Sequence, residues 1–209
     1  MRDGPESEQA ELFPLLDAVP DPRQMIDDQR RALLDDTYRA VIGANGGTYA
    51  LTGGTETALM WDATMRTFVH GIWAGSIVCA QATCERTMAS LLELHYAVAP
   101  EPRGWRSWGL GRLIDHHREH DLVDPALLQD IQRVCEARKP FGHLKLPLEP
   151  GSLPHVGMEA LSRGEPFVEA QEVYVAKTAV LCIQTTIRVY FGDLWGRMPS
   201  PFATDHAEP

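Results

Sequence analysis

The sequence predicts an all-α fold, an antiparallel bundle of four main helices with additional N-terminal helices. Nearly every stretch of periodic apolar residues has the helical spacing of three or four rather than the alternation of a strand. Helix start and stop residues bound most of these stretches. The composition of the 209 residues, with 44% hydrophobic and 23% charged side chains, is that of a globular protein, which excludes wholesale disorder and fibrous classes.

Residues 1–54 are predicted to form an acidic N-terminal arm that contains a helix. Residues 1–36 hold ten acidic and four basic side chains. Asp21 and Pro22 are typical of an N-cap and a first helical turn, and they predict a helix that ends near residue 42.

A glycine-rich connection over 43–54 follows this helix, with a short extended piece expected at 48–52. It does not match the phosphate-loop pattern G-x-x-x-x-G-K-[S/T], so a nucleotide phosphate loop is not expected here. Thr55 is expected to cap the next helix.

The longest predicted helix covers 65–98, either separate from the helix begun at Thr55 or continuous with it. Gly71, Gly75 and Cys79 recur every four residues along it. Such a stripe of small side chains lets another helix approach closely, either within the chain or from a second copy.

Two shorter helices are predicted next, one capped by Ser107 and ending near residue 120, the other over 126–138. Asp124 and the proline after it mark the start of the second, and Pro140 is expected to end it.

Residues 144–166 hold four prolines and three glycines and are predicted to be irregular, with one short turn. The closing helix is predicted over 167–194. The helical domain would then cover 55–196, and 197–209 would form a disordered tail.

The cysteines and the N-terminus predict a cytoplasmic protein. Cys79, Cys84, Cys135 and Cys182 form no C-x-x-C pair and lie among apolar neighbours, which is typical of reduced core thiols. No secretion signal is visible. The uncharged stretch over 67–84 is interrupted by polar side chains, so a buried helix is expected rather than a membrane span.

The net charge of −10 argues against a protein that holds nucleic acid by charge alone. The negative charge is unevenly distributed along the chain, because residues 103–145 hold eight Lys or Arg and six Asp or Glu side chains. This locally basic region favours an anionic ligand there.

The most informative residue is Arg138. Leu127, Ile131 and Val134 share one helix face, and four residues further along that face lies Arg138. If the chain turns at the following proline, His143 comes back toward the guanidinium. Guanidinium binds phosphate through paired hydrogen bonds, and imidazole exchanges protons near neutral pH. The alternative is a cation at a helix C-terminus, with His143 as a turn residue.

The run over 137–143 resembles the R-x(4–6)-H motif of the HEPN superfamily of α-helical domains. The helical context over 60–194 is also similar to that family. A pattern on the long helix contributes to the resemblance: Ala80, Cys84, Glu85, Arg86, Leu91 and Leu92.

The resemblance implies a metal-independent endoribonuclease, a toxin or antiphage defence effector that works as a homodimer without a cofactor. His143 would be the acid–base group in attack by the RNA 2′-hydroxyl, and Arg138 would hold the phosphate. Lys139 and His117 are candidate substrate-binding residues. RNA or a nucleotide is the expected ligand, and a cognate antitoxin or defence protein the expected partner.

Lys139 stands where active HEPN members commonly carry a polar residue, frequently asparagine. A catalytically inactive HEPN-like module that binds a nucleotide or a protein is therefore the alternative. A helical interaction module unrelated to the family is a third interpretation, and it requires Arg138 and His143 to lie far apart.

Two other patterns carry residues with functional chemistry. His116, Glu119 and His120 spell H-x-x-E-H, a zinc-peptidase pattern. The apolar stripe before them predicts that His117 points inward and Glu119 points to the opposite side, so no metal site is expected. Trp105 and Trp108 stand near arginines and would either stack bases or anchor their loop to the core.

Overall fold

The computed structural model describes residues 19–44, 53–97, 100–142, 149 and 152–192. Within these ranges the regular structure is entirely helical, which confirms the all-α prediction. The extended piece expected at 48–52, the tail at 197–209 and His143 lie outside the described residues.

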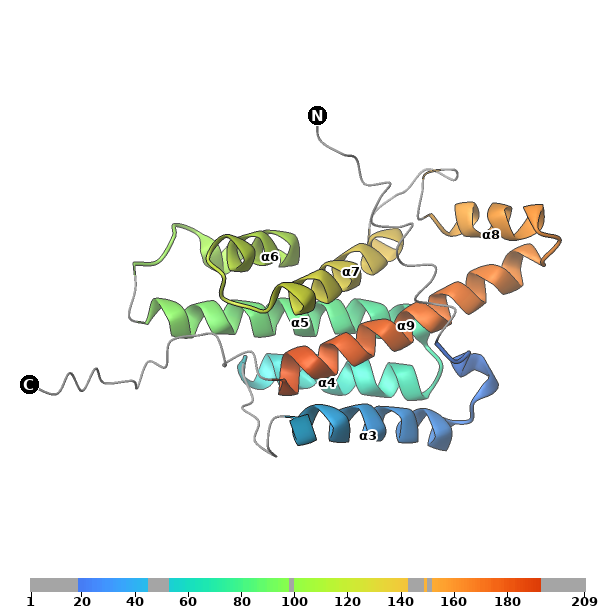
Figure 1. The fold of residues 1–209 in the computed structure, drawn as a ribbon, viewed down its shortest axis with the longest axis horizontal. Helices are drawn as coiled ribbons and strands as arrows, with labels where there is room; N and C mark the ends of the chain where they lie inside the picture. Colours follow the sequence, from blue (N-terminus) through green and yellow to red (C-terminus); the bar gives the residue numbers. More distant parts are fainter. Residues whose placement is uncertain (1–18, 45–52, 98–99, 143–148, 150–151, 193–209) are drawn as a thin grey trace, which may run out of the picture.

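Figure 1 shows two long helices, α5 and α9, with the other helices arranged around them. Helix α5 packs against α4, α6, α7 and α9, and α9 also packs against α3, α7 and α8. The bounds of these helices are α3 (Asp27–Ala44), α4 (Gly54–Val69), α5 (Trp73–Tyr96), α6 (Leu110–Glu119), α7 (Pro125–Gly142), α8 (Leu153–Ser162) and α9 (Phe167–Phe191).

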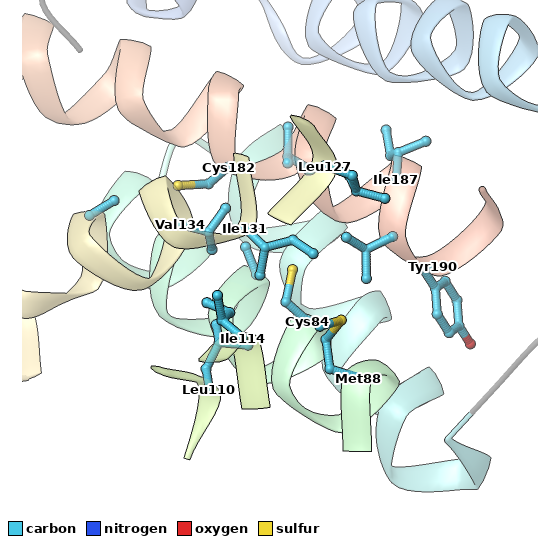
Figure 2. Packing of buried hydrophobic residues seen from close by; sticks show 14 of the residues in the cluster. Cys84, Met88, Leu110, Ile114, Leu127, Ile131, Val134, Cys182, Ile187 and Tyr190 are labelled. Atoms are coloured by element: carbon cyan, nitrogen blue, oxygen red, sulfur yellow. The ribbon is translucent and has the colours of Figure 1, made fainter. Parts of the chain in front are cut away.

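One apolar core joins α5, α6, α7 and α9, and Figure 2 shows side chains from all four helices meeting there. Met88, Ile131 and Ile187 are among its fully buried members. Leu34 of α3 belongs to the same cluster. Burial of this apolar surface is the main stabilising contribution to such a fold.

The N-terminal helix is shorter than predicted. Asp21 accepts a hydrogen bond from the backbone N–H of Arg23 at 3.0 Å, but it caps only the 3-10 turn Pro22–Gln24. Helix α3 then begins separately at Asp27. The cap was correctly identified, and the continuous helix was wrong.

The region predicted as one long helix is two helices with a turn between them. Gly71 has a φ of 72°, in the left-handed region that favours glycine, so it ends α4 rather than adding to a stripe on α5. Thr55 is not the cap of α4 either, because Gly53 occupies that position.

Helix α6 begins with help from α5. Ser107 lies in the 3-10 turn Trp105–Ser107, and the N-cap is Gly109, which has no side chain to offer. Glu85 supplies the missing acceptor, since its Oε2 receives the backbone N–H of Leu110 at 2.9 Å. The predicted Ser107 cap was wrong.

Helix α7 starts as predicted and ends later. Asp124 accepts the backbone N–H of Ala126 at 2.8 Å, and the helix continues through Pro140 to Gly142. A proline lacks the N–H that the carbonyl four residues earlier would receive, but this costs least near a helix end. The predicted end at residue 138 was wrong.

Residues 153–162 form α8, where an irregular segment was predicted. The hydroxyl of Ser152 accepts the backbone N–H of His155 at 3.2 Å, with Pro154 in the first turn. A capping serine followed by a first-turn proline is a helix-start signal. The high content of proline and glycine around it concealed that signal.

The four cysteines are free thiols. Cys84 and Cys182 are buried, and burial raises the pKa of the Cys84 thiol to about 12. Among the described helices, none combines the length and apolar character that crossing a membrane requires.

Candidate functional site

The C-terminal end of α7 carries Arg138 at the edge of the core. Leu127, Ile131 and Val134 are buried as the stripe predicts, and Ala137 is the last buried residue of the helix. Arg138 itself is half-buried. The guanidinium therefore lies at the border between the apolar interior and solvent, where an anionic ligand can reach it.

The side chain of Arg138 folds along the last turn of α7. A Cβ built on Gly142 would lie 3.1 Å from Cζ and 3.2 Å from one terminal nitrogen of the guanidinium. A larger residue here would move the guanidinium by a few tenths of an ångström, so Gly142 lets Arg138 lie close against the backbone of this turn. Gly142 directly precedes His143 in the sequence. The convergence of Arg138 with His143 stays a prediction.

The two cations at this helix end differ in their partners. The ammonium of Lys139 forms an ion pair with Glu136, one turn earlier. Within the described part of the chain, no acidic side chain forms an ion pair with Arg138. The N–H donors of the Arg138 guanidinium are therefore available to an anionic ligand, whereas the charge of Lys139 is balanced by Glu136.

His117 lies inside the core, with no exposed surface. Its Nε2 hydrogen-bonds the backbone carbonyl of Met88 at 3.1 Å, and its Nδ1 has no partner among the described residues. Burial lowers the pKa of His117 to about 4, so the ring is neutral at pH 7. His117 therefore faces inward, as the apolar stripe predicts, and lies away from any surface where it would touch a substrate.

Trp105 anchors its loop. It is 4% exposed, and its indole N–H donates to Glu101 at 2.9 Å. Trp108 is half-buried, with the guanidinium of Arg112 over its ring at 4.3 Å from the centroid. Trp105 therefore has no free face for a base, because its ring is packed into the protein.

A cavity of about 370 Å³ lies between α3, α7 and α9, beside the middle of α7. Its polar lining includes Asp130, Arg133 and Arg188, and Asp130 pairs with both arginines. Arg138 is outside this lining. Sequence reasoning missed these residues because Asp130 and Arg188 are 58 positions apart, and only the packing of α7 on α9 joins them.

The end of α6 gathers a second group of polar side chains. Ligand atoms of His116, Glu119 and His120 all lie within 4.8 Å of one another, so the prediction that Glu119 points away was wrong. Residues three and four positions apart share a helix face. The hydroxyl of Tyr96, on α5, forms a short hydrogen bond with Nε2 of His116.

His116 is only 8% exposed, and burial is the main cause that lowers its pKa below the ordinary value for histidine. The nearby charge of His120 acts in the same direction. Tyr96 gave no signal in the sequence, because nothing in the spacing of residues 96 and 116 indicates contact.

No protein-family model, no curated protein and no solved structure matches this chain.

Proposed function

We propose that the chain is a HEPN-like, metal-independent endoribonuclease with Arg138 and His143 at its active site. The observation that carries the proposal is the position of Arg138. Arg138 is half-buried at a helix end, and its guanidinium lies beside Gly142, the residue before His143. It also lacks an acidic partner among the described residues. A cation kept in this way is suited to a phosphodiester.

The proposed domain consists of α5, α6, α7 and α9 as the four main helices of a HEPN-like bundle. The contacts of α5 with α6, α7 and α9, and of α7 with α6 and α9, support this assignment. Two hydrogen bonds indicate the relative direction of α5 and α6. The earlier residue of α5, Glu85, binds the earlier residue of α6, Leu110, and the later residue, Tyr96, binds the later one, His116. These two helices therefore do not run antiparallel to each other.

In the proposed reaction, His143 takes the proton of an RNA 2′-hydroxyl, whose oxygen attacks the adjacent phosphorus. The bond from phosphorus to the 5′-oxygen breaks, and that oxygen regains a proton. The products are a 2′,3′-cyclic phosphate and a 5′-hydroxyl. Arg138 stabilises the charge that builds on the phosphate oxygens. A homodimer would bring two such sites together, and a toxin or defence role in the cytoplasm would follow from unspecific RNA damage.

The alternative is an inactive HEPN-like module that binds a nucleotide or a protein. The ion pair between Lys139 and Glu136 favours this alternative. The ammonium of Lys139, the residue after the arginine, is paired within α7 rather than with a substrate. In this case Arg138 recognises a phosphate without catalysing its transfer.

The test compares RNA cleavage by the wild-type chain, His143→Ala and the control His155→Ala, all purified without an affinity tag and in EDTA. Loss of an acid–base group lowers the rate by about 10²–10⁴-fold, and the control retains the wild-type rate. A substrate with one 2′-deoxy position should not be cut there. Binding of RNA or a nucleotide without cleavage establishes the alternative, and equal cleavage by wild type and His143→Ala rejects the assignment.

A further inference from the structure

A three-residue cluster at the end of α6 has the composition and spacing of a metal site. It consists of His116, Glu119 and His120, and their ligand atoms lie within 4.8 Å of one another. Around a tetrahedral ion with bonds of about 2.0–2.1 Å, ligand atoms are separated by about 3.3 Å. The three groups therefore need to approach one another by about 1.5 Å at most, which side-chain rotation can supply.

The cluster has one fixed ligand and two that can adjust. His116 is 8% exposed, and its ring is enclosed by Tyr96 and Trp108, with the Trp108 centroid 5.1 Å away. Glu119 and His120 are exposed, so their side chains can rotate and an ion can enter from solvent. The ring of His120 already lies 4.3 Å from that of His116.

Tyr96 provides the outer contact that a metal-bound histidine requires. Its hydroxyl is hydrogen-bonded to Nε2 of His116. When this hydroxyl oxygen accepts a hydrogen bond from the N–H at Nε2, the ring proton stays on Nε2 and the lone pair of Nδ1 is left for an ion. Histidine ligands are commonly oriented by such a partner on the other ring nitrogen. Here the partner comes from a different helix, so the site depends on the packing of α5 and α6.

The backbone beneath the cluster is well defined. Helix α6 ends with Asp121 at a φ of 52°, and the N–H of Leu122 returns to the carbonyl of His117 at 3.0 Å. This is the Schellman arrangement, which closes the last turn of a helix. Leu122 is buried and anchors the turn to the core.

We propose that His116, Glu119 and His120 bind one divalent transition-metal ion of the zinc class. Two imidazoles and one carboxylate suit Zn²⁺, Co²⁺ or Ni²⁺, whereas Mg²⁺ and Ca²⁺ prefer ligand sets made only of oxygen. Three protein ligands leave a position for water. The ion would hold the end of α6 and is independent of the proposed ribonuclease site at α7.

The experiment uses the full chain without an affinity tag, stripped with EDTA and dialysed, and titrated with Zn²⁺ in a calorimeter. One ion per chain is expected, with a rise in the unfolding temperature as Zn²⁺ is added. His120→Ala and Glu119→Gln should each weaken binding by at least about tenfold, and Tyr96→Phe by about tenfold. Both ligand variants alter exposed side chains, and circular dichroism verifies that they remain folded.

His155→Ala is the matched control, because His155 on α8 also faces a glutamate four residues later, with Nε2 and Oε1 of Glu159 3.4 Å apart, but has no second imidazole in the same turn. It should bind Zn²⁺ as the wild type does. Absence of saturable binding by the wild type overturns the proposal, as does undiminished binding by His120→Ala. Added Co²⁺ should give visible absorption bands in the wild type that His120→Ala loses.

Discussion

The C-terminal ends of α6 and α7 are built differently, although both carry the polar residues that attract functional interpretation. Helix α6 stops at a closed turn, and its three candidate ligands occupy that turn together. Helix α7 continues through Pro140, and Arg138 lies one turn before its end. The site at α6 is therefore complete within one helix and its neighbour, whereas the proposed site at α7 requires His143 from the segment that follows.

The difference shows which side-chain positions follow from spacing within one helix and which depend on the path of the chain after it. At α6 the positions of three side chains follow from helix geometry alone, because residues at i, i+3 and i+4 share a face. At α7 helix geometry determines Arg138 only. A second functional group has to be brought by a chain reversal, which helix periodicity does not define.

The largest expected effect is on RNA cleavage, and it tests the proposed site at the end of α7. Arg138→Lys keeps the positive charge but loses the planar fork that binds two phosphate oxygens, so RNA cleavage should fall by about 10²–10³-fold. Rates are measured on one defined RNA at fixed salt. Arg118→Lys, an exposed arginine of α6, should leave the rate unchanged. Equal rates for Arg138→Lys and wild type would remove Arg138 from the site.

A smaller effect concerns the histidine that α6 buries. The pKa of His117 is about 4 in the folded chain and near 6.5 when unfolded, so between pH 6.5 and pH 4 the unfolded state binds more protons than the folded state. Stability conferred by neutral His117 is complete above pH 6.5 and is lost as the pH falls toward 4. Between pH 7.5 and pH 5 the loss should be about 2 kcal/mol.

Urea unfolding in EDTA measures this loss, and His117→Gln is the comparison, because its amide can still donate to Met88. The variant should show a flatter dependence on pH over the same range. Identical pH profiles for the two proteins would contradict the assigned pKa.

The smallest effect tests the start of α6. Glu85→Ala leaves the N–H of Leu110 without its acceptor and should lower the free energy of unfolding by about 1 kcal/mol. Glu93→Ala, which removes an exposed glutamate of the same helix, should change it by less than about 0.5 kcal/mol. Chemical denaturation of both variants decides the matter, and equal stabilities would show that Glu85 does not cap α6.

Much of the helical content was predictable because apolar spacing reports directly on helix faces. The buried positions Ile131, Val134 and Ile187 follow from that spacing. Helix ends were less predictable. Gly71 interrupts a stretch whose periodicity continues across it, and α7 passes Pro140 because a proline near a helix end removes only one hydrogen bond.

The candidate sites show the same limit. His117 was correctly expected to face inward. The orientation of Glu119 was wrong because the apolar stripe was used to place a residue that helix geometry puts beside His116. Tyr96 and Glu85 act through contacts between helices, and a single sequence carries no direct record of which helices touch.

Helix α5 makes two hydrogen bonds to α6, and together they restrict how α6 can move. Glu85 binds the backbone of Leu110 at the start of α6, and Tyr96 binds His116 closer to its end. Because the two hydrogen bonds lie at separate points along α6, this helix cannot slide along α5 or rotate about its own axis without breaking at least one of them. A change confined to the exposed side chains of Glu119 and His120 can therefore occur by rotation of those side chains, without a shift of α6 along α5.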